Sequence, residues 1–173
     1  MKTQAITSLA ALALAAVTAP APAQSVGHRT RASVIVPVPT GLQVLAHNDL
    51  TFGNVLPGIP VHVTPRDALR AALFEIQGPS GAAIRIELAL PDAMTANEGA
   101  RLPLFFGPES GAFGVTRGPH EALDFNPIHP LITTLSNEGR LYVRLGGTAQ
   151  PNRPQDGGSY RGTILLSVFD IGS

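Results

Sequence analysis

The segment Ala72–Leu90, ALFEIQGPSGAAIRIELAL, decides the fold class, because apolar and polar residues alternate on either side of a short turn. Before the turn, Phe74 and Ile76 share one face and Glu75 takes the other. After it, four residues share one face: Ile84, Ile86, Leu88 and Leu90. Alternation of this kind is typical of half-buried antiparallel strands. We predict a β-hairpin whose apolar face points into a core, with Glu75 and Arg85 paired on the outer face.

The same period of two residues recurs in two later segments. In Glu138–Gly147, EGRLYVRLGG, the residues expected to face inward are Leu141, Val143 and Leu145, and those expected to face outward are Tyr142 and Arg144. In Tyr160–Ile171 one face consists of Tyr160, Gly162, Ile164, Leu166 and Val168. The opposite face of this last segment is also partly apolar, which predicts that it is more buried than the other strands.

Turn-forming residues are frequent, and helical periods are not. The chain contains 18 glycines and 16 prolines, a composition that suits short strands joined by turns. Pro65–Leu73 is the one helix-like window, and we expect either a short helical turn there or an irregular lead-in to the next strand. The spacing of about seven to nine short strands predicts an all-β fold, an antiparallel sandwich or barrel.

The N-terminus has the order of a secretory signal peptide. Lys2 precedes the apolar run Leu9–Val17, and Ala21 and Ala23 follow at the spacing of a signal-peptidase site, which predicts cleavage after Ala23. The run is shorter than the roughly 20 residues that span a bilayer. The alternative is a buried N-terminal helix.

These features divide the chain into a signal peptide at 1–23, an N-terminal extension or edge strand at 24–39, and a β-sandwich domain at 40–173. We expect export through the inner membrane to the periplasm, the cell surface or the outside, with no transmembrane segment in the mature chain. Twelve basic residues balance twelve acidic ones, so no electrostatic footprint for nucleic acid is present. Cysteine is absent, which excludes disulfides and thiolate sites.

Motifs for catalysis are missing from the sequence. It has no GxSxG elbow, HExxH pair, P-loop or dinucleotide-binding glycine pattern. Ser80 lies between glycines, but a turn is the better interpretation there. His47 and Asp49 form the one close pairing of a histidine with a carboxylate, and two ligands fall short of a zinc site. His62 is expected to face solvent. We therefore expect a protein that is not an enzyme and holds no cofactor and no metal.

Four segments resemble, in order, the bacterial family catalogued as domain of unknown function 4402: LTFGNVLPG (Leu50–Gly58), FEIQGPSGAAIRIEL (Phe74–Leu88), YVRLGGT (Tyr142–Thr148) and GGSYRGTILLSV (Gly157–Val168). The opening and closing segments are also similar to spore coat protein U and to archaic chaperone–usher pilins. The resemblance implies an exported, immunoglobulin-like sandwich without known catalytic residues. Two features depart from the relatives: the chain has Val168-Phe169-Asp170 where they usually end V-x-Y, and it lacks the pilin disulfide.

Pilin relatives lack one strand and fill the gap with a neighbour's N-terminal extension. The resemblance therefore implies strand addition, either between copies of this chain or with a periplasmic chaperone. The residues expected at such a pairing are Val34, Val36 and Val38 on the donor strand and Ile164, Leu166 and Val168 on the acceptor strand. The alternative is that Ala32–Pro39 is the first strand of its own domain, at a sheet edge because proline cannot donate to the ladder.

The functional expectation is an exported, non-enzymatic structural or interaction protein of the bacterial cell envelope, such as a fimbrial or surface-coat subunit. The alternative is a monomeric secreted binding module for a polysaccharide or another surface component. That alternative predicts an exposed cluster of aromatic and polar side chains supplied by Pro91–Pro130.

Overall fold

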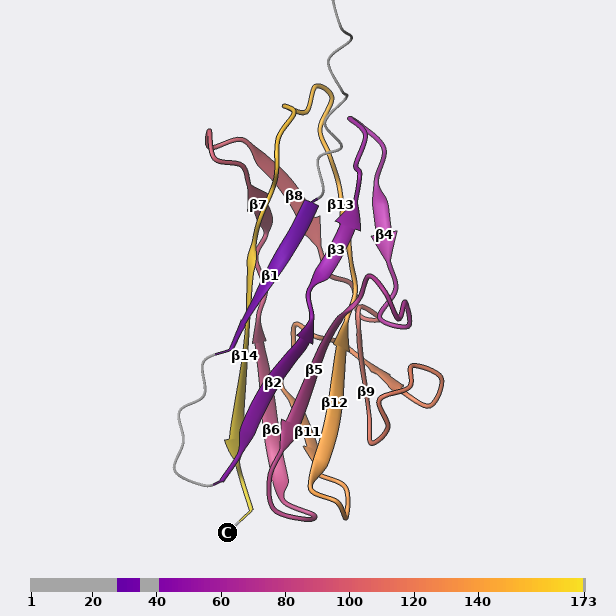
Figure 1. Cartoon of the computed structure of the whole chain (residues 1–173), viewed down its shortest axis with the longest axis vertical. Coiled ribbons are helices and arrows are strands. Elements are labelled where there is room, and N and C mark those ends of the chain that lie inside the picture. The colour runs from indigo at the N-terminus through magenta and orange to yellow at the C-terminus, as the bar shows by residue number, and fades with distance from the viewer. Residues whose placement is uncertain (1–27, 35–40, 173) are drawn as a thin grey trace, which may run out of the picture.

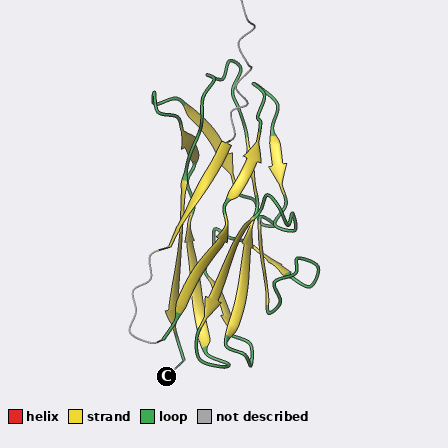
Figure 2. Cartoon of the chain, viewed as in Figure 1, coloured by secondary structure: helices red, strands yellow, loops and turns green. Residues whose placement is uncertain are grey.

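The computed structural model describes residues 28–34 and 41–172 of the chain. This part contains fourteen β-strands joined by loops and turns, and it contains no helix (Figures 1 and 2). The β14 sheet has the order β11 (Leu131–Thr134), β6 (Ala83–Ala89), β14 (Thr163–Asp170), β1 (His28–Val34) and β3 (Leu50–Gly53). The β12 sheet has the order β10 (Leu123–Phe125), β9 (Gly111–Gly114), β12 (Arg140–Leu145), β5 (Ala72–Gln77) and β2 (Gln43–Asn48). The β8 sheet has the order β4 (Val61–Val63), β13 (Gly147–Ala149), β8 (Arg101–Phe105) and β7 (Ala93–Thr95).

The expected all-β sandwich architecture is confirmed, with corrections to its details. The strand pairs are antiparallel except for β1 with β14, which is parallel. The predicted signal peptide at 1–23 lies outside the described residues, as do Val36 and Val38.

The strands outnumber the predicted seven to nine because single apolar segments are divided between sheets. Gly146 separates β12 from β13, so that one segment serves both the β12 sheet and the β8 sheet. A Cβ atom at Gly146 would lie 2.1 Å from the carbonyl oxygen of Val63, so only glycine permits this close approach of the two backbones. Sequence alternation continues across the break and does not reveal it.

The predicted hairpin at Ala72–Leu90 is wrong. β5 pairs with β12 and β2, whereas β6 pairs with β11 and β14, so the chain crosses from one sheet to the other at the turn between them. The predicted hairpin and the observed pair of strands on opposite sheets would bury the same residues. In either arrangement every second side chain of each strand points into the core. Glu75 and Arg85 consequently lie on different sheets and do not pair across a hairpin, and Glu75 and Glu87 are not cross-strand neighbours.

Two crossing turns lie against each other at this end of the molecule. The turn at 78–82 joins β5 to β6, and the turn at 135–139 joins β11 to β12. The Gly78 amide donates to the carbonyl of Gly139 at 2.9 Å, and the Gly81 amide donates to the carbonyl of Ser136 at 3.2 Å. A Cβ atom at Gly139, which has a φ of +69°, would lie 2.1 Å from the Gly78 oxygen. Glycine is required at position 139 because its φ is positive and because the Gly78 backbone lies so close. The two hydrogen bonds fix the position of one turn relative to the other.

The core is a single cluster to which the buried side chains of all three sheets contribute. The predicted inward residues that are buried there are Phe74, Ile76, Ile84, Ile86, Leu141, Val143, Leu145, Tyr160, Ile164, Leu166 and Val168. Leu88 and Leu90 are only partly buried. Two predicted outward residues, Glu75 and Arg144, are buried instead. Tyr160 precedes the last strand, which begins at Thr163 rather than at Tyr160.

Pro65–Leu73 is an irregular lead-in to β5, the second of the two expected forms. Asp67 organises it, because its Oδ1 accepts hydrogen bonds from the amides of Leu69 and Arg70, each at 3.0 Å. Its Oδ2 accepts a further hydrogen bond from Nε of Arg70 at 2.7 Å.

We expect Phe74→Ala to lower the free energy of unfolding by about 3–5 kcal/mol, because it leaves a cavity in the closed core. Phe105→Ala is the matched control, since 57% of Phe105 is exposed and its removal opens no cavity. Chemical denaturation of the two variants tests this; equal losses would show that the core is not where the structure places it.

Candidate functional site

Strand β14 is paired along both edges, once within the body of the sandwich and once with the N-terminal strand. β6 pairs antiparallel with one edge over Leu165–Asp170. β1 pairs parallel with the other edge, from Arg31 opposite Thr163 to Val34 opposite Leu166. The first half of β1, His28–Thr30, pairs antiparallel with β3. β1 therefore joins β14 to β3 within the described chain (Figure 1).

The residues predicted for strand addition do not all lie where β1 pairs with β14. Val34 lies in β1 with Leu166 as its partner, and Ile164 is opposite Ala32. Val168 pairs with Ile86 of β6 rather than with β1. The side chains predicted on the acceptor strand, Ile164, Leu166 and Val168, point into the core and are fully buried. What β14 offers to β1 is therefore its backbone edge. The edge strand expected at Ala32–Pro39 is described only as far as Val34, and there β1 lies between β14 and β3 instead of at the edge of the sheet.

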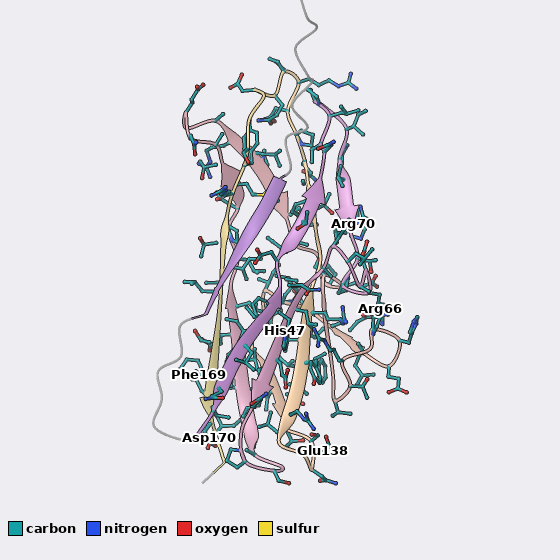
Figure 3. All side chains as sticks on the ribbon, viewed as in Figure 1. His47, Arg66, Arg70, Glu138, Phe169 and Asp170 are labelled. Carbon is teal, nitrogen blue, oxygen red and sulfur yellow. The ribbon has the colours of Figure 1, made fainter. Side chains whose placement is uncertain are left out.

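A polar cluster lies on the outer face of the β12 sheet. His47 lies on β2 (Figure 3). Its Nε2 lies 2.7 Å from Oε2 of Glu75 on β5. Nε2 of Gln77 donates to Oε1 of Glu75 at 2.8 Å. The hydrogen bond from Gln77 and then that from His47 lower the pKa of Glu75 below its ordinary value. The hydrogen-bond partner of His47 is thus Glu75, which the sequence analysis predicted to pair with Arg85 on the surface.

No group of three metal-ligating side chains occurs within the described residues. Ser80 lies in the turn between β5 and β6, as expected. His62 is exposed, as expected, and its Nδ1 lies 2.9 Å from Oγ1 of Thr148.

Arg144 is a buried cation on the outer face of β12, with 5% of its surface exposed. Its Nη2 donates to the carbonyl of Arg117 at 2.6 Å, while Nε and Nη1 have no hydrogen-bond partner. Burial lowers the pKa of Arg144, and the positive charge of Arg117 lowers it further. Sequence alternation did not predict this burial, because the Arg117 carbonyl that Arg144 contacts lies in the loop after β9, 27 residues away along the chain.

Phe105 is the most exposed aromatic side chain of the described chain, at 57%. It lies in one row with Thr148 and His62 across β8, β13 and β4, because Thr148 is opposite Phe105 on one side and opposite His62 on the other. Leu102 and Leu104 of the same strand are buried, so alternation directs Phe105 to the outer face.

Two depressions meet at Phe105. One, of about 350 Å³, is mainly apolar and is lined by Leu88, Leu90, Pro91, Asp92, Leu104, Phe105, Phe106 and Ile128. The other, of about 270 Å³, is lined by His62, Thr64, Arg66, Phe105, Gly107, Pro108, Glu109, Ser110 and Thr148. The sequence indicated only the region, Pro91–Pro130. The alternation of Leu102 and Leu104 within RLPLF is the signal that could have identified Phe105 itself.

Comparison with known proteins adds no relative: no protein-family description matches the chain, and no curated protein is significantly similar to it. Within residues 28–34 and 41–172, no helix has the length and apolar character needed to cross a membrane.

Glu75→Gln is expected to lower the free energy of unfolding by about 1 kcal/mol at pH 7. Because the folded-state pKa of Glu75 is lowered, the stabilisation is present above the ordinary glutamate pKa, about 4.3, and is lost as the pH falls through the folded-state value. The difference from the wild type should therefore shrink in acid. Denaturation curves at several pH values measure this, with Glu87→Gln as the control for loss of one carboxylate. A difference that grows toward low pH would contradict the prediction.

Arg144→Met is expected to leave the free energy of unfolding unchanged or to raise it, because the substitution removes a desolvated charge that has no counter-ion in the described chain. Water can replace the lost donor at the exposed Arg117 carbonyl. Thermal and chemical unfolding measure the effect, and Arg140→Met, on the same strand but exposed, is the control. A loss above about 2 kcal/mol would show instead that the guanidinium is satisfied by a bound group.

Proposed function

We propose that this chain is an exported, non-enzymatic structural or interaction protein of the bacterial cell envelope, whose N-terminal strand completes its β-sandwich. The proposal includes the cleaved signal peptide, an immunoglobulin-like topology and the kinship with the domain of unknown function 4402 and pilin-like subunits. The observation that carries it is the parallel pairing of β1 with the edge of β14.

Backbone chemistry makes this pairing suited to exchange. Without β1, the N–H and C=O groups along one edge of β14 would lose their partners, and an open apolar strand edge recruits another chain. A β1 segment from a second copy would form the same backbone hydrogen bonds as the chain's own β1. Exchange of β1 between two copies therefore loses few of the contacts that β1 makes within its own chain. Whether β1 pairs within its own chain or with a second copy then depends on the connection through residues 35–40 and on the protein concentration.

We expect deletion of residues 24–39 from the mature chain to lower thermal stability and to cause association through the open edge of β14. A synthetic peptide of residues 24–39 should restore the stability, and a peptide of the same composition in scrambled order should not. The concentrated mature chain should form ladders on denaturing gels that disappear on boiling. A deletion variant that stays monomeric with an unchanged melting temperature would overturn the strand-completion mechanism.

A second candidate function is a secreted binding module for a polysaccharide or another surface component. Exposed Phe105 favours it, since this side chain belongs to Pro91–Pro130, adjoins a polar depression and has no role in the core. The two candidates use different parts of the molecule, so each can fail without the other.

A further inference from the structure

We infer that the depression beside Phe105 binds a neutral saccharide, with one pyranose ring stacked on the Phe105 side chain and its hydroxyl groups hydrogen-bonded to Glu109, Thr148 and His62. We call this surface the Phe105 site. The inference deepens the second candidate function and does not depend on strand completion by β1.

Phe105 places an exposed aromatic ring beside the depression. The other six phenylalanines of the chain are buried or partly buried, whereas Phe105 is 57% exposed. The face of an aromatic ring carries partial negative charge, so it attracts the weakly positive C–H groups on the apolar face of a sugar ring. The strand row fixes the position of Phe105, because Thr148 on β13 lies directly opposite it.

The wall of the depression is held rigidly before any ligand binds. In the turn at 107–110, the Ser110 amide donates to the carbonyl of Gly107 at 3.1 Å, and the Gly107 amide donates to Oγ of Ser110 at 2.9 Å. The Gly146 amide donates to the carbonyl of Ser110 at 2.8 Å, which anchors the turn to the strand break between β12 and β13. A turn that is already ordered loses little conformational entropy on binding, which favours affinity.

The polar groups of the depression offer both donors and acceptors to hydroxyl groups. The carboxylate of Glu109 is exposed and accepts no hydrogen bond from the described residues. Nδ1 of His62 contacts Oγ1 of Thr148, which leaves Nε2 of the same ring for a ligand. A hydroxyl group both donates and accepts, so it can bridge a carboxylate and an imidazole nitrogen.

The charge balance of the site selects against anionic sugars. Nη1 of Arg66 donates to Oδ1 of Asp124 at 2.6 Å, and Nη2 donates to the carbonyl of Ala122 at 3.1 Å, so this guanidinium is already engaged. Its hydrogen bond to Asp124 is the main reason that the pKa of Arg66 is raised. Asp124 and Glu109 together outweigh Arg66 by one negative charge, which disfavours uronic acids and sulfated sugars at this rim.

The size of the depression suits one sugar ring. Its volume is about 270 Å³, just below the range of roughly 300–1,000 Å³ for sites that enclose drug-sized ligands. The apolar depression of about 350 Å³ on the other side of Phe105 leaves room for the next part of a longer chain.

Saturation-transfer difference NMR on the mature chain tests the inference. The probes are methyl glycosides of glucose, mannose, galactose and N-acetylglucosamine, with methyl glucuronide as the anionic comparison, each at about 10 mM so that a Kd near 1 mM is detected. We expect saturation of ring protons on one face of at least one neutral glycoside, and a weaker effect on the glucuronide.

Three variants locate the site. Phe105→Ala should abolish the transfer, and Glu109→Gln should weaken binding by about tenfold, the value of a hydrogen bond to a charged group. Ile132→Ala, which also removes an exposed apolar side chain but from β11, should bind as the wild type does. Unchanged melting temperatures establish that the variants are folded.

The inference is overturned if no neutral glycoside receives saturation, if the glucuronide binds more strongly, or if Phe105→Ala leaves the transfer intact. It is equally overturned if Phe105→Ala changes only the oligomeric state, since Phe105 would then contact another protein chain. A negative result here leaves the deletion experiment on residues 24–39 unaffected, so failure of the Phe105 site and failure of strand completion are distinguishable.

Discussion

The structure depends on the contact between two glycine-containing turns, in which the Gly78 amide donates to the carbonyl of Gly139 at 2.9 Å. Each turn carries the chain from one sheet of the sandwich to the other. Because the crossings lie against each other, β5 and β12 pair in one sheet while β6 and β11 pair in the other. The apolar faces of Phe74 and Ile76 on one side and of Ile84 and Ile86 on the other then enclose a common core. A side chain at Gly139 would collide with the backbone of Gly78 and separate the crossings.

The same crossing arrangement creates the polar features of the outer faces. Since β5 lies next to β2, Glu75 meets His47 of β2 instead of Arg85. Arg85 lies on the other sheet, where its guanidinium contacts Glu87 at 3.1 Å and stacks 5.0 Å from the ring centre of Phe169. The exposed ion pair between Arg85 and Glu87 contributes little to stability.

The two proposed interactions lie in separate parts of the molecule. Strand completion uses the backbone edge of β14, beside β1, whereas saccharide binding uses the outer face of the β8 sheet around Phe105. The proposed strand exchange would join copies of the chain through the β14 sheet, whereas the proposed saccharide site lies on the β8 sheet, so the two proposals are compatible. Multiple copies of a weak sugar site would then act together, and their combined affinity would exceed that of a single site.

The sequence by itself determined the all-β class and the inward faces of the segments around Phe74, Leu141 and Ile164, because a two-residue period places alternate side chains on one side of any strand. Only the tertiary structure decided which strands are neighbours: alternation has the same form in a hairpin and in a crossing between sheets. For that reason the burial of Arg144 beneath a distant loop, the pairing of Glu75 with His47 and the joining of Phe105 with His62 were not predictable. Each depends on contacts between residues far apart in the chain, for which local periodicity carries no information.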